Sequence, residues 1–234
     1  MRIIAPRYAR SWKKGGTTTA LLIDLSHPVV EGMETYRPLP TPQVEVLNDY
    51  DASRYEGKSE FLIASLHLCG NTGTYVDSPR HRFRDGVDLA GLSLTHLADL
   101  PVVLADATAT GRAIGPDALP TGDLHGKALL VRTEFSRHWG SDAYFTANPF
   151  LTADACEALV AAGVAFVGID SVNIDDIGDL ARPAHTILLG AGIPVCEHMT
   201  NLASIRSGGR LHAVPIAWVG GATFPVRAYV VSDG

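Results

Sequence analysis

The sequence predicts an α/β protein that forms a single domain. Two apolar runs of strand length, at residues 128–132 and 164–169, flank a helical pattern at 152–162 that Gly163 ends. The order helix, glycine, strand is typical of an α/β layer arrangement. A chain of 234 residues, of which 46% are hydrophobic and 19% charged, is long enough to bury one large core.

Other segments extend this interpretation along the chain. The helix at 152–162 begins with the capping residue Thr152 and has an acid, Asp154, in its first turn. A proline-rich stretch at 28–42 predicts an extended loop. Short apolar or alternating runs predict further strands at 21–25, 43–48, 61–69, 100–106, 187–195, 212–219 and 226–231. Since no repeat or linker is evident, we expect a basic extension at 1–20 and one domain at 21–234.

Charge and cysteine content limit the partners and the compartment. The net charge is −6 and the body of the chain has no basic stripe, so we expect a small-molecule substrate and neither nucleic acid nor a membrane as partner. No run approaches the roughly 18 to 20 apolar residues that cross a bilayer. The three cysteines, Cys69, Cys156 and Cys196, are odd in number and unclustered, which favours reduced thiols in the cytoplasm.

A first polar motif lies in residues 65–83. If the chain stays extended there, alternate side chains share one face. That face would carry Ser65, His67, Cys69, Asn71, Tyr75 and Asp77. Pro79 would end the strand and turn His81 back toward Asp77. A lone aspartate or histidine is commonly just exposed or hydrogen-bonded, so the motif gains meaning only with a second one.

The second polar motif lies in residues 182–202. His185 precedes an apolar run and Glu197 follows one. A carboxylate at the end of a buried strand is costly unless it is paired or bound to a metal. Glu197 is therefore either a metal ligand or the partner of a cationic side chain, unless it reaches the surface.

These two motifs resemble those of the cyclase family, which includes kynurenine formamidases and isatin hydrolases. The family signature is His-Thr-Gly-Thr-His-x-Asp-Ala-Pro-x-His, and residues 71–81 read Asn-Thr-Gly-Thr-Tyr-Val-Asp-Ser-Pro-Arg-His. Residues 23–27 and 167–171 also resemble the family, as do the His-x-x-Leu-Leu element from His185 and the Glu-x-x-x-Asn-Leu element from Glu197. The resemblance covers nearly the whole chain after residue 20. It implies a swivelling β/β/α domain with a mixed sheet or partly closed barrel, in a homodimer or homotetramer.

The resemblance also implies a metal site. Asp77, His185 and Glu197 match metal ligands of the family, while Asn71 and Tyr75 stand where two further histidine ligands are expected. One nitrogen and two carboxylates suit Zn²⁺ or Mn²⁺, and three protein ligands leave a position open for chemistry. We therefore expect one divalent metal per chain.

The expected catalytic residue is His81, which matches the proton donor and acceptor of the family. An imidazole that titrates near neutrality can take a proton from a metal-activated water and deliver it to the leaving nitrogen or oxygen. Asn71 could donate to a carbonyl oxygen and Tyr75 could hydrogen-bond the nucleophile, or both could be inert packing.

Other polar residues are weaker candidates. His67 is either a substitute ligand or a supporting histidine. Tyr36 lies near the place where the family has an aromatic contact to its substrate, or is an ordinary loop residue. From His27, Asp170 and Arg182 we expect structural hydrogen bonds.

The function implied by the resemblance is that of a metal-dependent hydrolase, similar to an arylformamidase, that cleaves a small cyclic or formylated amide or ester. Two alternatives stay open because Asn71 and Tyr75 depart from the signature. One is a degenerate member that binds a small molecule without turnover, and the other is a cyclase or lyase that uses the same metal.

Overall fold

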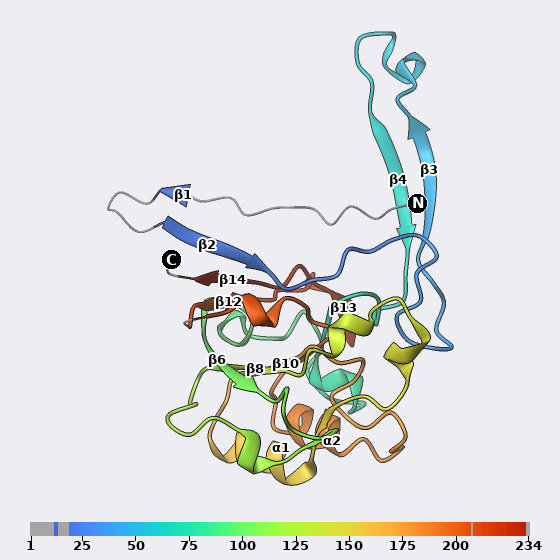
Figure 1. Cartoon of the computed structure of the whole chain (residues 1–234). Coiled ribbons are helices and arrows are strands. Elements are labelled where there is room, and N and C mark those ends of the chain that lie inside the picture. Colours follow the sequence, from blue (N-terminus) through green and yellow to red (C-terminus); the bar gives the residue numbers. More distant parts are fainter. Residues whose placement is uncertain (1–11, 14–18, 207, 233–234) are drawn as a thin grey trace.

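The centre of the fold is a curled, mixed sheet that the computed structural model forms from strands far apart in the sequence (Figure 1). The structure describes residues 12–13, 19–206 and 208–232. In this part of the chain the sheet has ten strands, in the order β1-β2-β14-β12-β6-β8-β10-β11-β5-β13. Their bounds are β1 Trp12–Lys13, β2 Thr19–Asp24, β5 Tyr75–Asp77, β6 Leu100–Asp106, β8 Ala128–Arg132, β10 Phe166–Ile169, β11 Val195–Glu197, β12 Arg210–His212, β13 Thr223–Pro225 and β14 Tyr229–Ser232.

The sheet is parallel at its centre and antiparallel at both ends. Strands β6, β8, β10 and β11 run parallel, and β5 and β13 add antiparallel strands beyond β11. The other end is antiparallel through β12, β14 and β2. The predicted α/β class with a mixed, partly closed sheet is therefore confirmed.

Both faces of the central strands are buried, in two separate cores. Leu129 and Val167 point toward the helices α1 (Ala153–Ala161) and α2 (Pro183–Gly190), which lie together on one side of the sheet (Figure 1). Leu130 and Phe166, one residue along each strand, point to the opposite core under β12 and β14. This alternation follows from the two-residue period of a strand. It explains why these strands read as continuous apolar runs.

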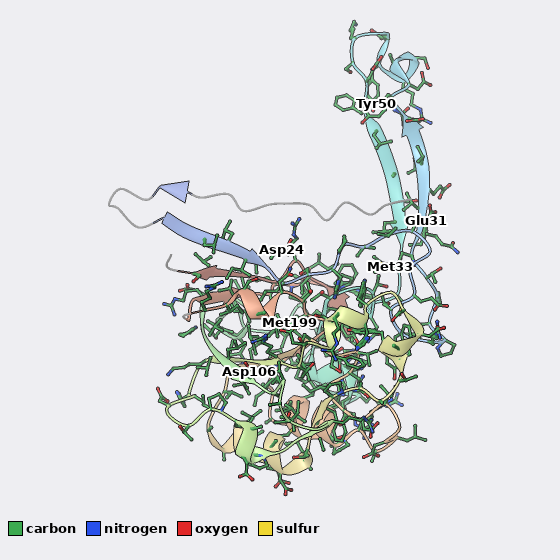
Figure 2. The ribbon with its side chains drawn as sticks, in the orientation of Figure 1. Asp24, Glu31, Met33, Tyr50, Asp106 and Met199 are labelled. Carbon is green, nitrogen blue, oxygen red and sulfur yellow. The ribbon has the colours of Figure 1, made fainter. Side chains whose placement is uncertain are left out.

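A two-stranded arm projects from this body. We call residues 43–67 the arm; it contains β3 (Gln43–Asp49) and β4 (Leu62–His67), which among the described strands pair only with each other. Tyr50, near its tip, stands far from the main sheet (Figure 2). The remaining elements are β7 Ala113–Ile114, β9 Phe150–Leu151 and the 3₁₀ helices η1 Ala52–Tyr55, η2 Pro79–His81, η3 Leu94–His96, η4 Pro116–Ala118, η5 Phe135–His138, η6 Asp142–Phe145 and η7 Leu202–Ser204.

Two predicted strands are wrong. Residues 187–190 belong to helix α2, and the strand β11 begins only at Val195. A short apolar run does not distinguish a buried strand from a buried helix, and Asp175, whose carboxylate caps the first turn of this helix, lies outside the run. In the segment 212–219 only His212 is in a strand. Pro215 has no N–H for a ladder, and residues 213–219 form a loop.

The continuous extended face predicted for residues 65–77 is also wrong. Strand β4 ends at His67, and the chain turns before β5 begins at Tyr75. Gly73 adopts a left-handed φ of 64° in this turn. Gly70 lies so close to β13 that a Cβ there would come within 2.3 Å of the Thr223 hydroxyl oxygen. The turn therefore separates the arm from the residues that follow it.

The predicted basic extension falls largely outside the described residues. Of residues 1–20, only 12–13 and 19–20 are described, and their backbones pair with one another as parts of β1 and β2. Among the described residues, none of the helices has the length and apolar character that a bilayer crossing needs.

Candidate metal centre

The strand register brings polar side chains of β5 and β11 to the face of the sheet that α2 covers. Val76 and Cys196 pack into the core on the opposite face. Their neighbours Asp77 and Glu197 therefore point toward α2, since successive side chains of a strand alternate. Helix α2 contributes His185 from its first turn, and His81 follows Asp77 at the end of η2.

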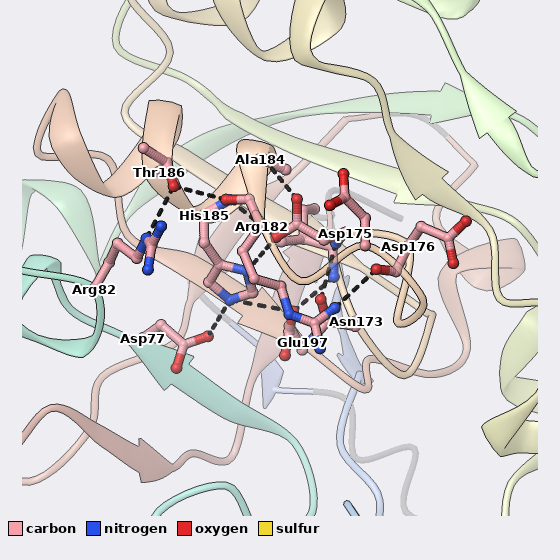
Figure 3. A network of polar contacts seen from close by, with 12 residues as sticks. Asp77, Arg82, Asn173, Asp175, Asp176, Arg182, Ala184, His185, Thr186 and Glu197 are labelled. Atoms are coloured by element: carbon pink, nitrogen blue, oxygen red, sulfur yellow. Dashed lines mark hydrogen bonds and ion pairs between the residues drawn. The ribbon is translucent and has the colours of Figure 1, made fainter.

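Figure 3 shows how Asp77 and Glu197 approach the His185 imidazole. The His185 Nε2 atom lies 3.6 Å from Asp77 Oδ2 and 3.5 Å from Glu197 Oε1. On the other side of the aspartate, His81 Nε2 lies 3.9 Å from Asp77 Oδ1. One ligand atom from each of Asp77, His81 and His185 lies within 4.8 Å of the others. The structure thus gathers four of the predicted site residues, from both polar motifs.

Several of these buried atoms lack hydrogen-bond partners among the described residues. They are both carboxylate oxygens of Asp77 and the Nε2 atom of His185. The side chain of Asp77 is 0% exposed and that of His185 5%. Burying an unpaired carboxylate costs several kcal/mol, by a rough estimate. A cation between these atoms would remove that cost, so the residues present fit a divalent metal.

Asp175 fixes the orientation of His185, a role that the sequence analysis missed. Its carboxylate accepts hydrogen bonds from the backbone N–H of Ala184 at 2.6 Å and of His185 at 3.2 Å. It also contacts His185 Nδ1 at 2.6 Å. With Nδ1 engaged, Nε2 is the ring atom that faces Asp77 and Glu197. Asp175 thus caps the first turn of α2 and orients the His185 imidazole.

The closely spaced carboxylates and their burial shift the pKa values of His185 and Glu197. Burial alone would lower the pKa of His185, but the negative charges of Glu197, Asp175 and Asp77 raise it to about 10. Burial raises the pKa of Glu197 to about 7. In the absence of a metal, a proton on His185 therefore supplies the positive charge that the carboxylates need.

The two residues that depart from the family signature lie beside the centre. Tyr75 is opposite Glu197 in the β5–β11 register, and its hydroxyl donates a hydrogen bond to Glu197 Oε2. Burial and the charges of Glu197 and Asp77 raise the pKa of Tyr75 well above its ordinary value. The side-chain oxygen of Asn71 accepts from the Thr223 hydroxyl at 3.3 Å.

Two weaker candidates have different outcomes. The Tyr36 hydroxyl accepts a hydrogen bond of 3.0 Å from the Arg182 guanidinium, next to the first turn of α2. The expectation that His67 is a substitute ligand is wrong. Its side chain lies on the arm and is 69% exposed, with Nε2 4.0 Å from Glu45 Oε2. The turn at residues 68–74 separates it from Asp77.

Structural hydrogen bonds were expected from three further residues. Asp170 accepts from Thr133 and from the Glu134 backbone, and Arg182 donates to the Asp176 carbonyl. The imidazole of His27 stacks on Trp139 with ring centroids 3.9 Å apart. Asp170 and Arg182 thus have the expected structural role, and the ring of His27 acts mainly through stacking.

Comparison with known proteins identifies relatives over most of the chain. The family model described as "Putative cyclase" matches residues 23–176. A kynurenine formamidase of Salinibacter ruber is 33% identical over 211 residues, which cover 88% of this chain and 95% of that protein. A kynurenine formamidase of Bacillus cytotoxicus is 30% identical over 213 residues, covering 89% and 96%.

Solved structures support the same fold. An isatin hydrolase bound to the product analogue thioisatinate superposes with a TM-score of 0.79 at 20% identity, covering 91% of this chain and 92% of that one. A potential metal-dependent hydrolase with cyclase activity gives a TM-score of 0.75 at 24% identity, covering 91% and 98%. The chain belongs to the cyclase family.

Proposed function

We propose that this protein is a metal-dependent hydrolase of the arylformamidase type, which cleaves a small cyclic or formylated amide or ester. The observation that carries the proposal is the buried group of Asp77, His185 and Glu197, in which the Asp77 oxygens and His185 Nε2 lack partners among the described residues. Relatives named kynurenine formamidase, at 33% and 30% identity over most of the chain, support amide hydrolysis.

In this proposal Asp77, His185 and Glu197 hold one divalent cation per chain, Zn²⁺ or Mn²⁺. One imidazole nitrogen and two carboxylates are a donor set that both ions accept. A bound cation would supply Lewis acidity, which lowers the pKa of a water and polarises the scissile carbonyl. The near-complete burial of the Asp77 and His185 side chains strengthens these charge interactions because little water screens them.

His81 is the general acid and base in this proposal. Its side chain is 34% exposed, whereas that of Asp77 is fully buried, so it borders both the centre and the entering substrate. Its Nε2 atom can take a proton from the attacking water and return it to the leaving nitrogen or oxygen. Asp77, 3.9 Å away, stabilises the positive charge on the ring between these two steps.

The proposed reaction can be tested with an N-formylated aromatic amine and, in parallel, an isatin-type cyclic amide. The purified protein is expected to hydrolyse at least one of them, to lose the activity on treatment with a chelator, and to regain it when Zn²⁺ or Mn²⁺ is added. Binding of these compounds without turnover in the metal-loaded protein would favour a binding protein. Turnover that a chelator does not affect would exclude the metal-dependent reaction.

We further propose that the protein works in the cytoplasm. Cys69, Cys156 and Cys196 are all free thiols, and two of them are fully buried. Unpaired cysteines are typical of reducing compartments.

We also propose a homodimer or homotetramer in which the arm packs against a second copy. Val44, Val46 and Leu66 lie on one face of the arm, since Val44 pairs with Leu66 and Val46 with Ala64. All three are exposed, by 43%, 55% and 51%. An isolated two-stranded ribbon is marginally stable, and an exposed apolar face of this kind is typical of an interface.

Changing this face is expected to break the assembly. The double variant Val46→Glu with Leu66→Glu should elute as a monomer in size-exclusion chromatography with light scattering, because it places charges in an apolar contact. Ser65→Asn, on the other face of the arm, should leave the mass of the assembly unchanged. A wild-type mass for the charged variant would reject the arm as the interface.

A further inference from the structure

The two carboxylate oxygens of Glu197, the proposed ligand from β11, have different hydrogen-bond partners. Its Oε2 atom accepts from the Tyr75 hydroxyl. Its Oε1 atom accepts from the Ile174 backbone N–H at 2.6 Å and lies 3.5 Å from His185 Nε2. Oε1 therefore faces the other proposed ligands, whereas Oε2 is hydrogen-bonded to the Tyr75 phenol.

The direction of the hydrogen bond between Tyr75 and Glu197 follows from the two groups. A phenol has one proton to donate and an ionised carboxylate can only accept, so the Tyr75 proton goes to Glu197 Oε2. This proton ties Oε2 to the ring of Tyr75.

Tyr75 has little freedom to move away from Glu197. Its side chain is 1% exposed, and β5 and β11 place it directly opposite Glu197. The unpartnered Asp77 oxygens and His185 Nε2 are distinct from these hydrogen-bonded groups. A cation would therefore meet Glu197 Oε1, while Oε2 stays with the phenol.

We propose that Tyr75 is a positioning residue that makes Glu197 bind the cation through one oxygen. This inference rests on the proposed function, since it assumes that the centre holds a metal. A carboxylate limited to one oxygen keeps the number of protein donor atoms low, which suits four-coordinate Zn²⁺. A carboxylate free to offer both oxygens suits the more oxygen-rich coordination of Mn²⁺.

The test is metal affinity in Tyr75→Phe, which keeps the ring and removes only the hydroxyl. Zn²⁺ binding, measured by competition with a chromophoric chelator, is expected to weaken about 10- to 100-fold, the usual effect of removing a group that orients a ligand. Mn²⁺ binding should weaken less, so the preference for Zn²⁺ over Mn²⁺ falls.

A matched control is Tyr144→Phe. Tyr144 is also fully buried, and its hydroxyl bonds His198 Nδ1 at 3.1 Å and not a proposed ligand. This control should keep the wild-type Zn²⁺ affinity and the wild-type ratio of the two metals. Equal Zn²⁺ affinity of Tyr75→Phe, Tyr144→Phe and wild type would overturn the inference and leave the metal-dependent function intact. A wild type that binds neither metal would instead overturn the proposed function.

A second measurement covers the case in which Tyr75→Phe does not fold. In a crystal structure of the Zn²⁺-loaded wild type, one oxygen of Glu197 is expected about 2.0–2.2 Å from the metal, with the Tyr75 hydroxyl still on the other oxygen. Two Glu197 oxygens on the metal, or a broken contact to Tyr75, would reject the positioning role.

Discussion

Asp77→Asn is expected to abolish metal binding at ordinary metal concentrations. The side chain of Asp77 is fully buried, and neither of its oxygens has a hydrogen-bond partner among the described residues, so both oxygens are available to a cation. Removing one member of a buried charge pair costs about 3 to 5 kcal/mol, which corresponds to a loss of affinity of roughly 10²- to 10³-fold or more. Isothermal titration calorimetry with Zn²⁺ and Mn²⁺ measures the loss.

The matched control for this variant is Asp170→Asn. Asp170 is also buried, at 2% exposure, but its carboxylate is held by Thr133 and the Glu134 backbone. The control is expected to bind metal normally, even if it unfolds at a lower temperature. Wild-type metal affinity in Asp77→Asn would remove Asp77 from the ligand set.

The same titration has an expected pH dependence. The metal-free protein keeps a proton on His185, whose pKa is raised to about 10. A cation bound at Nε2 must displace that proton, so each binding event below this pH releases at least one proton. Affinity of the wild type is therefore expected to rise with pH through the neutral range.

His81→Ala is expected to keep the metal and lose most of the turnover. The His81 side chain borders the centre, with its Nε2 atom 3.9 Å from Asp77 Oδ1, and the proposed ligands remain without it. Loss of a general acid and base typically lowers kcat by about 10²- to 10⁴-fold. Steady-state kinetics should therefore show a fall in kcat with little change in KM.

Metal content decides how a loss of activity in this variant is interpreted. If His81→Ala loses both metal and activity, His81 is a ligand, which its distance from Asp77 and His185 permits. If it keeps both, His81 has no role in the chemistry. His67→Ala, which changes an exposed imidazole on the arm, serves as the control and should match the wild type in both measurements.

The sequence predicted β6, β8 and β10 because each lies within a short, mostly apolar run. The observed bounds of β6 and β8, Leu100–Asp106 and Ala128–Arg132, agree with the predicted 100–106 and 128–132. Helix α2 was missed because its start depends on Asp175, whose carboxylate accepts the N–H groups of Ala184 and His185 across a loop. An interaction of this kind leaves no periodic pattern in the sequence.

Some residues of the candidate site could likewise be predicted from the sequence, and others could not. The resemblance to a family pointed to Asp77, His81, His185 and Glu197, and the structure brings them together. The link from Tyr75 to Glu197 was not predictable, because it depends on the β5–β11 register. The prediction for His67 was wrong because it assumed one continuous strand from His67 to Asn71. The strand ends at His67, and a turn follows it.

The central claim is that one divalent cation is shared by Asp77, His185 and Glu197. Anomalous diffraction from crystals of the active enzyme grown with Zn²⁺ or Mn²⁺ tests it most directly. The account predicts one strong peak per chain, about 2.0–2.2 Å from an Asp77 oxygen, His185 Nε2 and a Glu197 oxygen. An active crystal without a peak at this place, or with its metal held by other residues, would contradict the account.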